Sequence, residues 1–341
     1  TGVQTCALPI SPTDIGSYMV IATVAADGNY NSANSSSTSF SINIGTPVVT
    51  LTVGTYTYNE SPQGPNAATN TGTGSSYTYS YSGTGGTTYG PSSTAPTNVG
   101  TYSVTVSVAA STDGFYNAAS SAATAFTIAT KTLTIGAATI ASKTYNGLTA
   151  TGAITPGSLS GLVSTQTLVV TATGTYANAN VGNGKSATIT YSLADGTNGG
   201  LAANYSLANG SGTGNITVAS LSITANNDSK TYGQTKTYGA GSTAFASIGL
   251  QNGETIGSVT MTASGGATAA SAVGNYTLTP SAATAGTFTS SNYTISYATG
   301  TLTVNAASLT ITGISANNKV YDGTTTATRS EEHTSELQSR G

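Results

Sequence analysis

The residue types best suited to chemistry in this 341-residue chain are its one Cys and one His, which ionise or react near neutral pH. Cys6 is a candidate nucleophile, and His333 is a candidate general base or metal ligand. One Cys cannot form an intramolecular disulfide, and a structural zinc site needs several Cys or His ligands. The chemistry open to this chain therefore depends on whether Cys6 and His333 belong to a folded domain.

Both residues lie in terminal segments that resemble translated sequencing adapter. Residues 329–339 read Arg-Ser-Glu-Glu-His-Thr-Ser-Glu-Leu-Gln-Ser, which is the direct translation of a widely used adapter oligonucleotide. Residues 1–10 read Thr-Gly-Val-Gln-Thr-Cys-Ala-Leu-Pro-Ile, which follows from the reverse complement of the same oligonucleotide. Segments of this origin are excluded from fold reasoning. We therefore interpret 1–10 and 329–341 as adapter-derived and not native, and 11–328 as an internal piece of a longer gene.

Residues 11–328 are poor in charge and hold no Cys, His or Arg. Their six Lys and eight acidic residues give a net charge of −2, without the basic excess that a nucleic-acid surface needs. Without Cys or His, catalytic triads and Cys–His pairs are excluded. Acidic residues that occur singly do not supply the clustered carboxylates that Ca²⁺ needs. We predict no catalytic residue, no cofactor, no metal site, no nucleic-acid partner and no membrane span in this segment.

The elements that must position the remaining side chains recur with a spacing of 88 residues. Ser-Leu-Ser-Ile-Thr at 220–224 returns as Ser-Leu-Thr-Ile-Thr at 308–312, and Leu133 precedes Leu221 by the same spacing. Each opening is followed by a Lys-x-Tyr turn signal. We assign a structural role in this repeat signature to Tyr145, Tyr232, Tyr321, Gly147, Gly233 and Gly323.

The same recurrence predicts the domain organisation. Residues 12–44 and 96–128 share a second pattern, Pro-Thr-Asx-x-Gly-x-Tyr, which marks an earlier pair of modules. Closing strands run into the next opening strand within a few residues, so no linker separates the modules. We expect the C-terminal part of one module at 11–45, complete modules at 46–130, 131–219 and 220–307, and the start of another at 308–328.

Hydrophobic periodicity predicts a mainly β fold. Apolar and polar residues alternate at 77–81, 102–108, 221–223 and 302–304, which is the pattern of half-buried strands. Strong helix formers are scarce, and Asp-Gly and Asn-Gly turn signals recur. The pattern favours tandem small antiparallel β-sandwich modules of Ig-like type. The alternatives are a β-grasp variant with one short helix near 158–164 or 250–256, and disorder, which the regular repeat disfavours.

The repeated motifs resemble bacterial repeat families. Residues 131–219 resemble a YDG-type repeat through Lys143-Thr-Tyr145-Asn-Gly147 and Asn204-Tyr205, and 308–328 resemble the start of another through Tyr321-Asp322-Gly323. Residues 220–307 resemble an MBG domain of the YGX type through Lys230-Thr-Tyr232-Gly233, Val273-Gly-Asn-Tyr276 and Asn292-Tyr293. Residues 11–45 and 46–130 resemble bacterial Ig-like repeats. The resemblance implies long secreted or outer-surface proteins of Gram-negative bacteria, including adhesin-like ones, without assigned catalysis.

Two groups of residues are candidates for binding or crosslinking. Tyr77, Tyr79 and Tyr81 share one face of a predicted strand, so their rings are candidate contacts for a sugar or a protein, with core packing as the alternative. Lys143, Lys230 and Lys319 recur at one position, which suggests a Lys–Asn isopeptide crosslink. That chemistry needs a buried carboxyl group, which only Glu254 could supply; the alternative is a strand-end lysine whose amine stays in water.

These observations predict a non-catalytic fragment, not an enzyme, from a secreted or cell-surface multidomain protein, serving as stalk and adhesion repeats. The expected partners are neighbouring repeats of the same chain and an extracellular glycan or protein ligand. The expected location is extracellular or at the bacterial cell surface. The alternative is a set of carbohydrate-binding accessory modules of a secreted enzyme whose catalytic domain lies outside the fragment.

Overall fold

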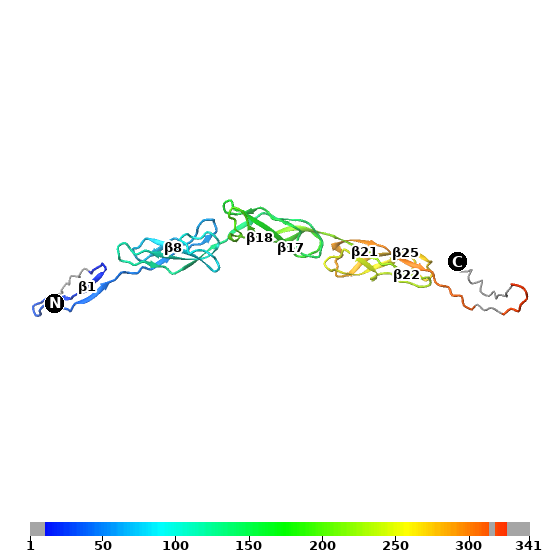
Figure 1. Cartoon of the computed structure of the whole chain (residues 1–341), viewed down its shortest axis with the longest axis horizontal. Coiled ribbons are helices and arrows are strands. Elements are labelled where there is room, and N and C mark those ends of the chain that lie inside the picture. Colours follow the sequence, from blue (N-terminus) through cyan, green and yellow to red (C-terminus); the bar gives the residue numbers. More distant parts are fainter. Residues whose placement is uncertain (1–10, 314–317, 326–341) are drawn as a thin grey trace. The chain divides into compact units, whose positions relative to one another are not determined.

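The computed structural model describes residues 11–313 and 318–325. The two terminal segments interpreted as adapter-derived lie outside the described residues, as do 326–328 of the predicted last repeat. The described residues form two compact units. The first contains those up to Lys143 together with Thr149–Ile216, and the second contains Thr144–Leu148 together with those from Thr217 onward. Strands dominate both units (Figure 1), which confirms the predicted mainly β fold.

The first unit begins with two short antiparallel ribbons in residues 11–45. β1 (Gly16–Val20) pairs with β4 (Thr38–Ile42), and β2 (Thr23–Val24) pairs with β3 (Ala33–Asn34). Tyr18 stacks on Phe40 with a centroid separation of 5.6 Å. None of residues 11–45 is fully buried, because a two-stranded ribbon has no second layer to pack against.

Residues 46–130 form a sandwich around a long central strand. β9 (Gly100–Val108) pairs antiparallel with β8 (Tyr77–Thr84), β10 (Ala119–Ser120) and β11 (Thr124–Ala129), and β6 (Tyr56–Thr57) pairs with β11. β5 (Val49–Leu51) and β7 (Ala68–Asn70) form a separate pair. Alternate residues of β9 point inward as predicted: Tyr102, Val104, Val106 and Val108 are at most 2% exposed.

Residues 131–219 form a second sandwich. Its four-stranded sheet has the order β14 (Lys143–Thr144), β20 (Gly210–Thr217), β18 (Gly182–Asp195) and β17 (Leu168–Tyr176). Its three-stranded sheet has the order β16 (Leu159–Ser160), β12 (Lys131–Ile135) and β19 (Tyr205–Leu207). β13 (Thr139–Ile140) and β15 (Ile154–Thr155) add a short ribbon.

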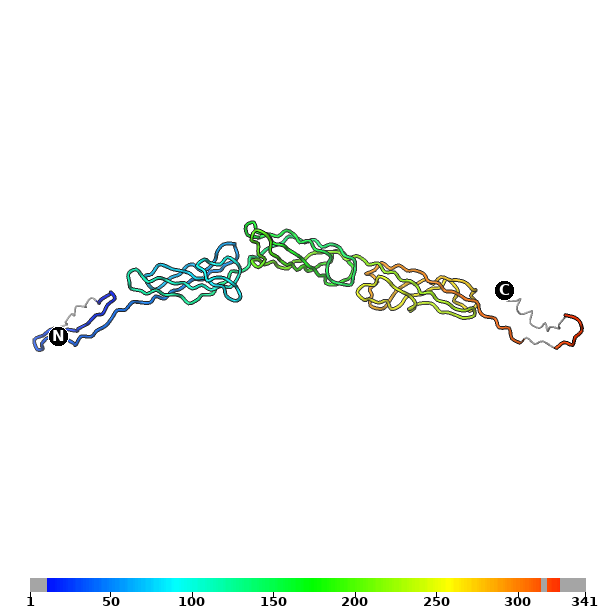
Figure 2. Tube along the Cα trace, in the orientation of Figure 1, coloured from blue at the N-terminus to red at the C-terminus, as the bar shows by residue number. Residues whose placement is uncertain are grey.

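Residues 220–307, in the second unit, follow the same plan as 131–219 (Figure 2). The four-stranded sheet has the order β22 (Asp228–Thr231), β27 (Gly300–Asn305), β25 (Gly274–Gly286) and β24 (Ile256–Ala263). The three-stranded sheet has the order β23 (Phe245–Ile248), β21 (Ala219–Ala225) and β26 (Tyr293–Ala298). β21 begins at Ala219, one residue before the predicted start of this repeat, and the predicted repeat limits stay a prediction.

The sheets are mixed, a feature that the predicted antiparallel sandwich did not include. β21 pairs parallel with β26, and β22 pairs parallel with β27. In the first unit β12 pairs parallel with β19, and β6 pairs parallel with β11. Periodicity identifies strands but carries no information on their pairing direction. Because the first strands of each repeat run parallel to its last strands, the chain enters a sandwich at one end and leaves it at the other.

The short helix of the β-grasp alternative does not form. β16 lies in the interval 158–164, and a turn at residues 252–253 lies in the interval 250–256. Gly161, Asn252 and Gly253 have φ values of 96°, 49° and 72°, which are incompatible with a right-handed helix. In the described parts of the chain the helices are two 3₁₀ turns, η1 (Ala202–Asn204) and η2 (Ser290–Asn292). No helix among these residues has the length and apolar character needed to cross a membrane.

Candidate functional site: the tyrosine clusters around Gln166 and Glu254

The predicted ligand-contact strand, β8, faces largely into its own sandwich. Tyr81 is 3% exposed and donates a hydrogen bond to the carbonyl oxygen of Pro65 at 2.7 Å. Tyr79 stacks on Tyr81 with centroids 6.2 Å apart, and its hydroxyl donates to a backbone carbonyl. Tyr77 and Tyr79 are half-buried. Tyr81 is therefore a core residue, and ligand contact through Tyr77 and Tyr79 stays a prediction.

The three signature glycines lie at turns that need a left-handed backbone. Gly147, Gly233 and Gly323 have φ values of 73°, 93° and 69°. A Cβ atom makes this conformation costly, which accounts for the recurrence of Gly at this position. The glycine therefore sets the backbone conformation of the turn. The side chain that can make further contacts is the tyrosine, which lies two residues earlier in Lys-x-Tyr-x-Gly and one residue earlier in Tyr-Gly.

The signature tyrosines hold equivalent backbone positions. The N–H groups of Tyr145 and Tyr232 donate to the carbonyl oxygens of Thr217 and Asn305, each at 2.8 Å, at the end of the closing strand of the repeat. Tyr58 makes the same bond to Ala129 at 3.0 Å. Sequence reasoning missed Tyr58 because neither Lys nor Gly flanks it. The available signal was its spacing, since Tyr58, Tyr145 and Tyr232 follow one another at intervals of 87 residues.

In the first unit, Tyr58 belongs to a buried group of three side chains that we call the Gln166 cluster: Tyr58, Gln166 and Tyr205. The amide nitrogen of Gln166 donates to the Tyr58 hydroxyl at 2.9 Å, and the Tyr205 hydroxyl donates to the amide oxygen at 2.6 Å. The two rings meet edge to face with centroids 5.3 Å apart. All three side chains are at most 5% exposed. Tyr58 comes from the 46–130 repeat, and the other two come from the 131–219 repeat.

The 3₁₀ turn η1 places the Asn-Tyr pair of this cluster. It ends at the buried Asn204, directly before Tyr205, and the Tyr205 hydroxyl accepts a hydrogen bond from the backbone N–H of Val163 at 3.1 Å. Asn204 accepts from the backbone N–H of Val99 at 2.9 Å and donates to the side chain of Asn98 at 3.0 Å. The Asn-Tyr pair therefore adds a second polar contact between residues of the two repeats in the first unit.

The second unit contains the equivalent Glu254 cluster: Tyr145, Glu254 and Tyr293. The Tyr145 hydroxyl donates to one carboxylate oxygen at 2.5 Å, and the Tyr293 hydroxyl donates to the other. The rings again meet edge to face, with centroids 5.4 Å apart. The Tyr293 hydroxyl accepts from the backbone N–H of Gln251 at 2.9 Å, as Tyr205 does from Val163. Tyr145 belongs to the 131–219 repeat in sequence, but its segment Thr144–Leu148 is part of the second compact unit.

The electrostatics of both clusters favour neutral tyrosine hydroxyls that act as donors. Burial raises the pKa of Tyr205 above its ordinary value. Burial and then the hydrogen bond to Glu254 raise the pKa of both Tyr145 and Tyr293. Hydrogen bonds from Ser164 and then Gln166 lower the pKa of Glu60. The raised pKa values keep these tyrosine hydroxyls protonated, as hydrogen-bond donors must be.

Lys230 is an exception to the expectation that the strand-end lysines keep their amines in water. Lys230 is 3% exposed, so its ammonium group is buried and does not stay in water. It donates to the backbone carbonyls of Gln234, at 2.8 Å, and Thr268. Glu254, the carboxyl group that an isopeptide crosslink would need, is occupied by the two tyrosines of its cluster. The fold therefore supplies Lys230 with carbonyl acceptors in place of a crosslinking partner.

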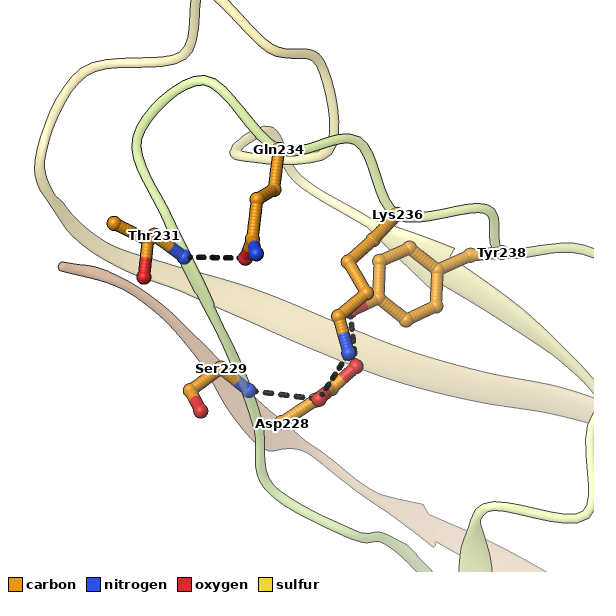
Figure 3. A network of polar contacts seen from close by, with 6 residues as sticks. All are labelled: Asp228, Ser229, Thr231, Gln234, Lys236 and Tyr238. Atoms are coloured by element: carbon orange, nitrogen blue, oxygen red, sulfur yellow. Dashed lines mark hydrogen bonds and ion pairs between the residues drawn. The ribbon is translucent and has the colours of Figure 1, made fainter. Parts of the chain in front are cut away.

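A further polar network surrounds Asp228 in the second unit (Figure 3). Lys236 forms an ion pair with Asp228 at 2.8 Å, and Tyr238 donates to the same carboxylate at 2.9 Å. Burial by itself would raise the pKa of Asp228, but hydrogen bonds from Lys236 and Tyr238 lower it. Burial and then Asp228 raise the pKa of Tyr238 to about 12. The network pins the loop after β22 and presents no cluster of carboxylates; across residues 11–313 and 318–325, no three His, Cys, Asp or Glu side chains gather as a metal site.

The fold and the clusters define a class of protein: tandem β-sandwich repeats with recurrent tyrosine–amide or tyrosine–carboxylate contacts. In family terms, residues 129–213 match the model of the YDG domain, and residues 221–303 match the model of the MBG domain (YGX type). The chain therefore carries a YDG domain followed by an MBG domain, which confirms both expected resemblances. These are families of a non-catalytic type.

Comparison with whole proteins adds little to the family matches. Among curated proteins, no sequence matches this chain. The solved structure of Drosophila N-cadherin EC1-4 is 10% identical and covers 87% of this chain and 85% of its own, with a TM-score of 0.21. A likeness this weak carries no inference about function.

Proposed function

We propose that the chain is a non-catalytic segment of a secreted or cell-surface protein, in which the repeats act as a stalk and as adhesion modules. The observation that carries this proposal is the Gln166 cluster, which joins two successive repeats within one compact unit through buried hydrogen bonds. Spacer modules need junctions that resist bending. Buried hydrogen bonds meet this need because they weaken when the angle between donor and acceptor changes.

The topology supports the same role. Each sandwich receives the chain at one end and releases it at the other, because its first and last strands run parallel. Repeats built in this way can follow one another without a long return connection. The small number of charged residues suits an outer surface that avoids non-specific electrostatic binding.

The stalk role is tested by measuring distances within the first unit. Ser93→Cys and Thr173→Cys place labels at exposed positions of its two repeats, in a Cys6→Ser background that leaves no other thiol. Single-molecule energy transfer should give one narrow distance distribution, and Gln166→Ala should broaden it. A distribution that is already broad, and that Gln166→Ala leaves unchanged, would show that the junction does not act as a rigid spacer.

Adhesion and the alternative carbohydrate-binding role are tested with the full chain on a glycan array. Sugar binding that Tyr77→Ala and Tyr79→Ala abolish would favour accessory carbohydrate-binding modules. Tyr77 and Tyr79 are the candidate contacts on β8, and because they are half-buried, a sugar could contact only the exposed part of each ring. Uniform absence of binding would leave the spacer role as the supported one.

A further inference from the structure

The end of the 220–307 repeat carries an uncovered counterpart of the two tyrosine clusters. Tyr58, Tyr145 and Tyr232 occupy the same backbone position, each with its N–H bonded to the end of the closing strand. Tyr58 is 3% exposed and Tyr145 is 5% exposed, whereas Tyr232 is 48% exposed. The rings of Tyr58 and Tyr145 are covered by Tyr205 and Tyr293, whereas Tyr232 has no ring contact of this kind among the described residues.

Val99 and Val273 differ in the same way as Tyr58 and Tyr232, since only the first of each pair is contacted by the following repeat. Val99 and Val273 each open a Val-Gly-x-Tyr motif, and the tyrosines of both motifs, Tyr102 and Tyr276, donate to the carbonyl oxygen four residues earlier, at 2.7 and 3.0 Å. The backbone N–H of Val99 is held by Asn204 at 2.9 Å. Val273 is 57% exposed. In this repeat the counterparts of two contacted positions, Tyr232 and Val273, are therefore both exposed.

The sequence spacing of the known contacts indicates what covers such a face. Tyr58 meets Gln166 108 residues later, and Tyr145 meets Glu254 109 residues later. Counted from Tyr232, the counterpart falls at Arg340 or Gly341, and neither residue has a side-chain acceptor of the kind that Gln166 and Glu254 provide. Residues 308–313 carry the apolar positions of another opening strand, but Leu309 is 87% exposed, whereas its equivalent Leu221 is 1% exposed.

We propose that the Tyr232–Val273 face is a docking site for one further repeat of the YDG or MBG type. The incoming repeat supplies a Gln or Glu that accepts from the Tyr232 hydroxyl, and an Asn-Tyr pair whose ring covers Tyr232 and whose amide binds the backbone at Val273. The inference rests on one part of the proposed stalk role, namely that repeats follow one another along the chain.

The test extends the existing chain in register. Residues 308–341 are replaced by a second copy of 220–307, which offers its own Glu254 and Asn292-Tyr293 to Tyr232. A parallel chain carries a copy of 132–219 in the same place and offers Gln166 and Asn204-Tyr205. Nitration of tyrosines followed by peptide mass mapping then reports the accessibility of Tyr232, with Tyr58 and Tyr145 as internal references for covered rings.

In the present chain Tyr232 should be nitrated readily, and in the extended chains its rate should fall about tenfold, in line with the exposed fractions of 48% and 5%. Glu254→Ala in the added copy alone should restore the rate, and Glu254→Gln there should keep the protection. If Tyr232 is nitrated as fast in both extended chains as in the present chain, the docking site is refuted. The energy-transfer experiment on the first unit is independent of this result, so the stalk role can stand or fail separately.

Discussion

Replacing Glu254 by Ala removes the shared acceptor of two nearly buried tyrosine hydroxyls. Tyr145 is 5% exposed and Tyr293 is 6% exposed, and both hydroxyls donate to the Glu254 carboxylate. Hydrogen bonds to a charged group contribute about 1.5–3 kcal/mol each, and a buried donor left unpaired costs about 1–3 kcal/mol. Glu254 itself is half-buried, so water can reach part of the space that Ala leaves. We expect a loss of about 2–4 kcal/mol in the free energy that holds Thr144–Leu148 in the second unit.

Glu254→Gln is the matched control, because the Gln166 cluster shows that an amide can fill the same place. There the amide oxygen accepts from Tyr205 while the amide nitrogen donates to Tyr58. A glutamine at 254 can accept from one tyrosine and donate to the other in the same way. We therefore expect Glu254→Gln to cost less than about 1 kcal/mol, the size of one rearranged neutral hydrogen bond.

The assay is hydrogen exchange of the full chain, followed by mass spectrometry of peptides that contain 144–148 and 251–256. A loss of about 2–4 kcal/mol corresponds to exchange that is roughly 30-fold to several hundred-fold faster in the opening-limited regime. Asp322→Ala, which removes an acid from an exposed turn, should leave both peptides unchanged. Equal exchange in Glu254→Ala and the parent chain, or equal acceleration by Ala and Gln, would refute the assigned role of the cluster.

Three other outcomes follow from the same contacts. Gln166→Glu should destabilise the first unit more than Glu254→Gln destabilises the second, because it places a carboxylate beside Glu60 and removes the amide donor to the Tyr58 hydroxyl; thermal unfolding of the two variants compares them. The second unit should lose stability in alkali: the pKa of Tyr238 is raised from 10.0 to about 12, so its contribution is complete below about pH 10 and is lost as the pH rises through about 12. Tyr238→Phe should remove that part of the alkaline loss in a pH series of denaturant melts. Lys236→Met should cost less than about 1 kcal/mol at pH 7, because the Lys236–Asp228 pair is more than a third exposed on both sides, and a larger loss would contradict the weak role given to it.

Much of the local structure could be predicted from sequence because it depends on local patterns. The alternation at 102–108 predicted a strand whose inward residues are buried, and β9 has that pattern. The Gly of the Lys-x-Tyr-x-Gly signal predicted a turn, and Gly147 adopts the positive φ that a turn of this kind needs. The recurring motifs indicated YDG and MBG repeats, and both family models match the chain. Periodicity and turn chemistry act over a few residues, so they can be read without knowing the fold.

The candidate site depended on contacts that no local pattern encodes. Tyr58 meets Gln166 across 108 residues and Tyr145 meets Glu254 across 109 residues, and both pairings depend on tertiary packing. The sequence marked Tyr145 as recurrent and Glu254 as an isolated acid, without a reason to join them. Lys230 was expected to keep its amine in water, and only the packed sandwich shows the carbonyl acceptors that allow its burial.

The sequence by itself determined that this chain is a tandem array of β repeats with few charged groups, because composition and spacing alone specify strands, turns and a recurring unit. The tertiary structure decided which of the recurrent tyrosines are covered and by what. The physical reason is that strand formation depends on neighbours along the chain, whereas the burial of a hydroxyl depends on finding its acceptor in a separate repeat.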